Sequence, residues 1–276
     1  MVITKTERRA VVVDAWRDPD DLRPNKQAPH LSHSRVAKYL LCPEQYRLYY
    51  VENFYPRSPS ANLAFGQAIH QALAAGLADS GKPEALFAEI WTRVRDTSLT
   101  YSTRDSWEKL QAVGNAMLRK FMAEERGKLG TIHAIEQPFQ LDITSLDLPF
   151  VGIIDLVADV EQKRTVVDFK TAAAAYEPHE VELADQLTAY QLAEPESVNS
   201  AFWVFVKTKE PRIEWHPTTR TPGQFTEYLT KVGLVGREIA AGHFYKRPGK
   251  WCSWCDYLPV CLGDRRRAEE TLVQVK

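Results

Sequence analysis

The sequence lacks several features that would assign a chain of 276 residues to a particular functional class. It has no run of about 18 apolar residues, which a transmembrane helix requires. Its first residues, Met-Val-Ile-Thr-Lys-Thr-Glu-Arg-Arg, contain no apolar signal-peptide core, so we expect a cytoplasmic protein. It contains no Gly-x-x-x-x-Gly-Lys-Ser/Thr loop, which argues against an ATP-driven motor, and no internal repeat or low-complexity tract.

A strong net charge is also missing. With 35 basic and 36 acidic residues the formal charge is −1, so no global positive field attracts a polyanion. A polyanion site would have to be a local patch, for which an ordinary solvated surface is the alternative interpretation. The candidate basic residues are Arg35, Lys38 and Arg47 near the start, and Lys246, Arg247, Lys250 and Arg265, Arg266 and Arg267 near the end.

Cysteine is scarce, but its placement is informative. Three of the four cysteines, Cys252, Cys255 and Cys261, lie close together, and Cys42 is far away in the sequence. In a reducing compartment such thiols favour metal ligation over disulfides. The spacing is unlike the paired knuckles of most zinc sites, and the aromatic residues around the cluster would shield it from water. We therefore favour an iron–sulfur cluster over zinc or four free thiols.

Apolar periodicity predicts helices first and strands afterwards. Helices are expected from Ser32 or Ser34 through Leu41 and over 43–51, 63–78, 84–95 and 106–128. Strands are expected over 135–143, 150–160 and 165–171, then a helix over 180–193, strands over 201–207 and 212–216, and a helix over 222–241. The segment from His243 is expected to be loop-like. This order indicates one α/β core with helical and C-terminal additions.

Two acids and a lysine interrupt apolar strands. Asp155 ends Gly-Ile-Ile-Asp, and Asp168 and Lys170 belong to Asp-Phe-Lys on the next strand. Buried carboxylates are costly without a partner, and a divalent metal such as Mg²⁺ or Mn²⁺ would provide one. A salt bridge between Asp168 and Lys170, which point to the same strand face, is the simpler alternative.

Three further side chains lie at helical spacing. His70 lies four residues after Gly66, and Tyr190 lies four residues after Gln186, so each pair shares a helix face. Gln186 could bind a phosphate, a water or Lys170, and Tyr190 could stack on a base. Each residue taken alone is more often an ordinary core or surface residue. Only their combination with the acids favours a site.

These motifs, in this order, resemble the PD-(D/E)xK nuclease superfamily, and within it the RecB-like iron–sulfur exonucleases, which include CRISPR-adaptation nucleases and the nuclease module of AddB-type helicases. The likeness covers about residues 31–264. The segment from Ser32 to Tyr46, with Cys42-Pro43, matches the family's leading segment. The other matching motifs are Gly66 to His70, Asp155, Asp168 to Lys170, Gln186 to Tyr190 and the cysteine triplet. Ile154 stands where the superfamily name implies proline.

The resemblance implies a restriction-endonuclease-like core, with a mixed central sheet flanked by helices, N-terminal helices and a C-terminal iron–sulfur segment. It implies that His70, Asp155, Asp168 and the backbone carbonyl of Phe169 hold Mg²⁺ or Mn²⁺, and that Lys170, Gln186 and Tyr190 act with them in catalysis. Cys42, Cys252, Cys255 and Cys261 would hold a 4Fe-4S cluster.

The implied activity is metal-dependent cleavage of DNA, as an exonuclease on single strands or ends. The alternatives are a non-catalytic DNA-binding or recombination partner, and a zinc-braced endonuclease. Lys246, Arg247 and Lys250 are candidate DNA contacts, and a protein partner in CRISPR adaptation, recombination or phage replication would fit. We expect a polar leader at residues 1–30, one domain at 31–264 whose ends are joined by the metal cluster, and a tail at 265–276.

Overall fold

The computed structural model describes residues 30–79, 81–143 and 148–275. Nearly all of the polar leader expected at residues 1–30 therefore lies outside the described residues. Among those residues no helix is both long enough and apolar enough to cross a membrane.

The order of helices and strands follows the sequence expectation closely. The helices are α1 (His33–Leu41), α2 (Pro43–Tyr46), α3 (Ala61–Asp79), α4 (Pro83–Arg93), α5 (Trp107–Lys120), α6 (Pro178–Glu182), α7 (Asp185–Ala193), α8 (Pro222–Ala240), α9 (Leu258–Leu262) and α10 (Arg265–Thr271). Shorter turns of π or 3-10 helix are η2 (Arg47–Val51), η3 (Phe121–Glu125), η4 (Arg126–Lys128) and η5 (Lys250–Trp254). The strands are β1 (Phe54–Pro56), β2 (Leu129–Leu141), β3 (Phe150–Val160), β4 (Lys163–Ala172), β5 (Asn199–Val206), β6 (Arg212–Thr218) and β7 (Leu272–Gln274).

Local sequence signals set several helix starts. Ser32 caps α1 by accepting a hydrogen bond from the backbone N–H of Arg35. Pro43 and Pro222 occupy the first turn of their helices, where the missing N–H costs nothing. Thr221 and Gln224 form a capping box at α8, in which each side chain accepts from the other's backbone N–H.

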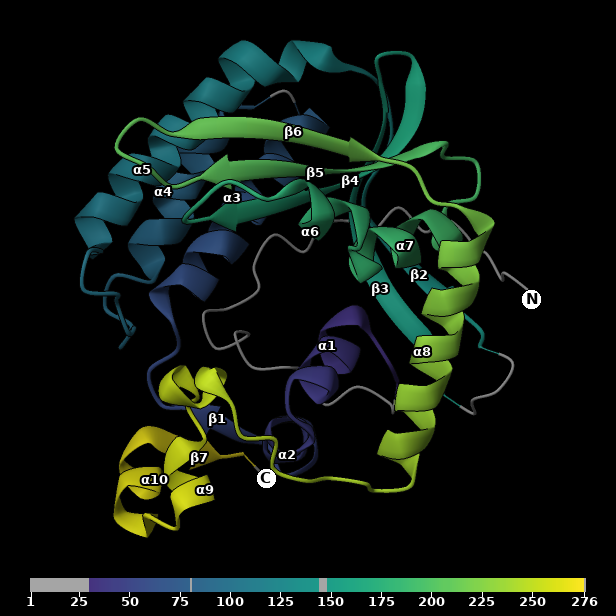
Figure 1. The fold of residues 1–276 in the computed structure, drawn as a ribbon. Helices are drawn as coiled ribbons and strands as arrows, with labels where there is room; N and C mark the ends of the chain where they lie inside the picture. Colours follow the sequence, from purple (N-terminus) through teal and green to yellow (C-terminus); the bar gives the residue numbers. More distant parts are fainter. Residues whose placement is uncertain (1–29, 80, 144–147, 276) are drawn as a thin grey trace.

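Five strands form one mixed sheet in the order β2-β3-β4-β5-β6 (Figure 1). Only β4 and β5 run parallel, and the chain between them passes through α6 and α7. Helices α3, α4 and α5 pack on one side of the sheet. Helices α1, α7 and α8 pack on the other, so β4 is covered on both sides.

Side-chain alternation along β4 separates the two layers. Val167 and Phe169 point into the core formed with α3 to α5. Val166 points into the core formed with α1, α7 and α8, and the strand period of two places Asp168 and Lys170 on that same face. An acid and a lysine are thereby placed beneath α7, in the interior of the molecule.

The helix expected over 180–193 is broken into α6 and α7. Ala184 takes an extended backbone conformation at the break. The buried guanidinium of Arg220 donates to the carbonyl oxygens of Val181, Glu182 and Ala184 around this break. An arginine far along the chain therefore stabilises a break that local periodicity does not reveal.

The segment from His243, expected to be loop-like, contains η5, α9, α10 and a strand. Strand β7, within the expected tail 265–276, pairs antiparallel with β1, with Phe54 opposite Gln274. Leu48, Tyr257 and Leu272 are buried together beneath this pair. The Tyr257 hydroxyl donates to the Phe54 carbonyl at 2.8 Å. Strand β1 and the C-terminal segment therefore form one small layer (Figure 1).

Candidate active site

Asp155 lies where the pairing of β3 with β4 ends. The antiparallel register runs from Val160 opposite Lys163 to Leu156 opposite Val167. Just beyond it, the Asp155 Oδ2 atom accepts a hydrogen bond of 2.8 Å from the backbone N–H of Phe169. The residue is 8% exposed. The carboxylate thus replaces a strand carbonyl as the acceptor, which fixes its position at the fork between the two strands.

Asp168 and Lys170 lie next to each other on β4. The Lys170 Nζ atom is 2.5 Å from Asp168 Oδ2. Asp168 is 1% exposed, while the Lys170 side chain reaches a partly open position. The salt bridge that the sequence offered as the simpler alternative is therefore present, in a buried setting.

Helix α7 adds an amide and a phenol to the two charges. The Gln186 Nε2 atom donates to Asp168 Oδ1 at 2.6 Å and to the Tyr190 hydroxyl at 2.8 Å. The Gln186 Oε1 atom accepts from Lys170 Nζ at 2.7 Å. One glutamine therefore contacts an acid, a lysine and a tyrosine, which requires the break before α7 to set the helix in the right place.

His70 approaches from the opposite layer. Its Nδ1 atom lies 3.2 Å from Asp155 Oδ2. Helix α3 packs closely on β4 here, because a Cβ added at Gly66 would lie 3.3 Å from Thr171 Oγ1. Glycine at this position lets the helix carry His70 down to the end of the sheet. The structure thus brings together the six side chains that the sequence singled out, namely His70, Asp155, Asp168, Lys170, Gln186 and Tyr190.

The charges in this cluster act strongly on one another because water is largely excluded. Burial raises the pKa of the Asp168 carboxyl, the charge of Lys170 opposes the rise, and Asp155 adds to it. Burial acts to lower the pKa of Lys170, but Asp168 outweighs it and the net shift is upward. Burial likewise acts to lower the pKa of His70, and the hydrogen bond and charge of Asp155 reverse the sign.

The donor set fits a hard divalent cation. Asp168 Oδ2 is buried and, within the described residues, accepts no hydrogen bond of good geometry despite the nearby ammonium. An unsatisfied carboxylate oxygen beside a second carboxylate is a site that a cation would stabilise. Across residues 30–79, 81–143 and 148–275, no three His, Cys, Asp or Glu side chains are already arranged as a closed metal site.

Comparison with known proteins identifies the family. A family model described as the PD-(D/E)XK nuclease superfamily matches residues 30–262. The chain belongs to the PD-(D/E)XK nuclease superfamily. It is therefore a nuclease, and nucleases of this superfamily generally use divalent metals such as Mg²⁺ or Mn²⁺. The five-stranded mixed sheet flanked by helices fits the restriction-endonuclease-like fold expected from the sequence.

A solved structure supports the fold. A crystal structure of a candidate exonuclease from Eubacterium rectale matches with a TM-score of 0.55 at 12% identity, covering 83% of this chain and 88% of that chain. At this identity the likeness shows the fold alone. The crystal structure of SSO0001 matches with a TM-score of 0.43 at 12% identity, covering 88% of this chain and 90% of that chain. Comparison with curated proteins gave no match.

The four cysteines of this PD-(D/E)XK nuclease lie in one region but do not form a closed site. All are free thiols and partly buried. Burial raises the pKa of the Cys255 thiol, and the nearby Cys42 and Cys252 add to the rise. Gln45 Nε2 lies 3.6 Å from Cys255 Sγ. The soft donors are of the right kind for a cluster, while the described residues show no group of three in ligating geometry.

The three basic residues expected to contact DNA are partly occupied within the protein. Lys246 Nζ donates to the Cys261 carbonyl at 2.8 Å, and Arg247 donates to the carbonyl of Leu40. Arg247 also lies over the ring of Trp251 at 5.5 Å. Lys246 and Arg247 therefore fasten the C-terminal segment internally, whereas Lys250 is exposed.

Sequence reasoning missed His33 and Arg220. His33 opens α1, and burial, followed by the charge of Lys170, lowers its pKa to about 4. It therefore lies within electrostatic reach of the site. The sequence signal that could have drawn attention to His33 is its position directly after Ser32, a residue that can cap a helix. Arg220 had no local signal, because its partners are on α6 and α7.

Proposed function

We propose that this nuclease is a metal-dependent DNA exonuclease of the RecB-like iron–sulfur branch, acting on single strands or DNA ends. The observation that carries the proposal is the buried network in which Gln186 joins Asp168, Lys170 and Tyr190 beside Asp155. Buried acids and a lysine held this closely are costly for stability alone, so a catalytic use is the better account.

The metal-binding residues would be Asp155, Asp168, His70 and the backbone carbonyl of Phe169. Carboxylate and carbonyl oxygens suit Mg²⁺, and an imidazole ligand shifts preference toward Mn²⁺. When bound, such an ion supplies a Lewis acid for the phosphodiester and lowers the pKa of water.

The remaining side chains orient and stabilise. Lys170 carries its ammonium between Asp168 and Gln186, so its donors are fixed before the substrate arrives. In this position it orients the attacking water and stabilises the negative charge that develops on the phosphate. Gln186 holds the lysine through its Oε1 atom, and Tyr190 holds Gln186. A preorganised ammonium of this kind needs no rearrangement during the reaction.

The four cysteines would bind a 4Fe-4S cluster with a structural role. Cys42 lies between α1 and α2, and the other three lie in the C-terminal segment. The cluster would connect these two parts of the chain, alongside the pairing of β1 with β7. Anaerobic purification tests this assignment, with brown colour, iron and labile sulfide expected. Stoichiometric zinc without iron would contradict it and favour the zinc-braced alternative.

Digestion of end-labelled single strands with Mg²⁺ or Mn²⁺ tests the activity. Asp168→Asn keeps the side-chain shape and removes the charge, and Lys170→Met removes the ammonium. We expect the asparagine variant to be inactive and the methionine variant to lose roughly 10²- to 10³-fold in rate. DNA affinity and thermal unfolding report whether either variant remains folded. Wild-type rates in both variants would refute the assignment.

Matched controls lie on the same strands. Asp159→Ala removes a partly exposed acid on β3 that pairs with His133 at 2.8 Å. Lys163→Met removes an exposed lysine at the start of β4. Both are expected to cut at the wild-type rate. Circular single strands separate the exonuclease from the endonuclease, because an exonuclease needs an end.

A further inference from the structure

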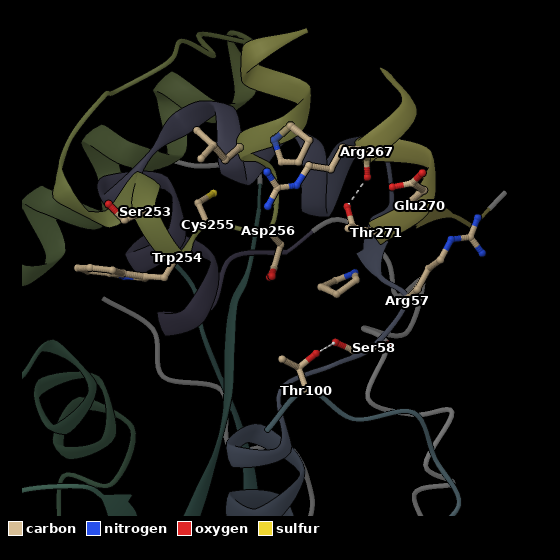
Figure 2. Close-up of a pocket in the computed structure, with 13 residues that line it drawn as sticks. Arg57, Ser58, Thr100, Ser253, Trp254, Cys255, Asp256, Arg267, Glu270 and Thr271 are labelled. Carbon is tan, nitrogen blue, oxygen red and sulfur yellow. Dashed lines mark hydrogen bonds between the residues drawn. The ribbon is translucent and has the colours of Figure 1, made fainter. Parts of the chain in front are cut away.

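A polar cavity is lined by none of the residues of the carboxylate network. Its volume is about 440 Å³, and it lies between the residues after β1 and the C-terminal segment (Figure 2). Its lining comes from three places. Arg57 follows β1, Trp254 is the last residue of η5, and Asp256 comes shortly after it. Arg267 and Glu270 belong to α10.

The charged side chains of this lining are two arginines, Arg57 and Arg267, and two acids, Asp256 and Glu270. Glu270 lies 4.0 Å from Arg266, which is outside the lining.

The two arginines of the lining have no ion-pair partner of this kind. Within the described residues neither Arg57 nor Arg267 lies within salt-bridge distance of a carboxylate. The Nε atom of Arg57 donates to the carbonyl of Glu269 at 3.0 Å, which holds the guanidinium in place and leaves its two terminal nitrogens available. In Figure 2 Arg267 reaches across the cavity above Asp256. The held guanidinium of Arg57 and the exposed guanidinium of Arg267 can each bind a phosphate.

A large aromatic side chain completes the cavity. Trp254 is 72% exposed, and in Figure 2 it lies at the opposite edge from Arg57. No ring contact or hydrogen bond of its side chain is found within the described residues. An exposed indole is unfavourable in water, but an unpaired base can stack on it.

We propose that this cavity binds a segment of single-stranded DNA, with a base stacked on Trp254 and phosphates held by Arg57 and Arg267. The inference rests on the proposed function, since it takes DNA as the substrate. Its size suits about one nucleotide. Stacking on Trp254 requires an unpaired base, so duplex DNA would not use this surface fully. The cavity anchors the strand at a distance from the place where it is cut.

Equilibrium binding of labelled oligo(dT) to the full chain, with EDTA present so that no strand is cut, tests the cavity. Trp254→Ala is expected to weaken binding by roughly 5- to 150-fold, the range that loss of one stacked base produces. The Arg57→Gln/Arg267→Gln variant is expected to reduce the slope of log affinity against log salt by about 1.4, because each phosphate contact on a single strand contributes about 0.7.

Control variants use exposed residues outside the cavity. Leu262→Ala removes an apolar side chain of nearly equal exposure, 73%, on α9. Arg119→Gln/Arg237→Gln removes two exposed charges from α5 and α8. Both are expected to keep the wild-type affinity and salt slope. If they weaken binding as much as the cavity variants do, the effect is general charge or surface loss and the inference is wrong.

Crosslinking gives an independent readout. An oligonucleotide containing 5-iodouracil, irradiated on the wild-type protein, is expected to attach to Trp254. Attachment only elsewhere, or unchanged affinity in the cavity variants, overturns the inference even where Asp168→Asn abolishes cutting. Conversely, strand binding at Trp254 without cutting in Mg²⁺ or Mn²⁺ retains this inference and refutes the proposed exonuclease.

Discussion

Replacing Arg220 by methionine tests how the site is held in place. Arg220 is 8% exposed, and its guanidinium donates five hydrogen bonds. Three go to the carbonyls at the break between α6 and α7, and two go to the hydroxyls of Thr188 and Thr218. The substitution removes these five bonds, but each of the three carbonyls keeps a second donor, Ala184 N–H for Val181, Gln224 Nε2 for Glu182 and Thr188 N–H for Ala184. Taking the low end of the net value of a hydrogen bond, about 0.5 kcal/mol for each of the five, the loss is about 2.5 kcal/mol.

Urea unfolding of wild type and Arg220→Met at equal protein concentration measures this loss, with an unchanged slope expected. The rate of DNA cutting should fall as well, because α7 carries Gln186. Arg220→Lys keeps the charge but not the planar set of donors, and should lie between the two. The exposed Arg237→Met on α8 serves as the control, with a change within about 0.5 kcal/mol. A loss below 1 kcal/mol for Arg220→Met would refute the reasoning.

Three further substitutions have defined outcomes. Gly114→Ala should destabilise the protein by about 1–3 kcal/mol, because the added Cβ would lie 2.2 Å from a ring atom of Phe87. Gly127→Ala is the control, since nothing lies near the Cβ that it would add, and thermal unfolding compares the two variants. Tyr190→Phe should keep the fold and lower the cutting rate about tenfold, since the glutamine loses one partner; an unchanged rate would count against it. His33 is neutral in the fold with a pKa of about 4, so stability present above pH 6.5 declines toward pH 4. In His33→Gln the fall in the free energy of unfolding between these pH values should be smaller by on the order of 1–2 kcal/mol. Identical profiles of unfolding free energy against pH in wild type and variant would contradict this.

Much of the site follows from local patterns in the sequence. The strand 150–160 has the bounds expected from the sequence, because it is largely apolar and the charged residues Glu161 and Lys163 follow it directly. Asp168 and Lys170 share a face because strand side chains alternate, and Gln186 and Tyr190 share one because of the helical period. Within each of these two pairs, secondary structure alone therefore sets the spacing of the side chains.

The remaining features depend on contacts between distant residues. The break before Asp185 requires Arg220, and α9, α10 and β7 are too short to be stable without the surface formed by Leu48 and β1. Such short elements have weak intrinsic preference, and only tertiary packing decides them. The orientation of His70 toward Asp155 likewise depends on how α3 lies against the sheet.

The pairing of β1 with β7 also constrains the order of events during synthesis. Phe54 is synthesised long before its partner Gln274, and the Gln274 side chain donates to a carbonyl 222 residues earlier. Until the ribosome has passed Gln274, this edge has no partner and Leu48 has no cover from Leu272. A nascent chain that stops before Leu272 therefore leaves β1 and the side chain of Leu48 open to chaperones or to pairing with another chain.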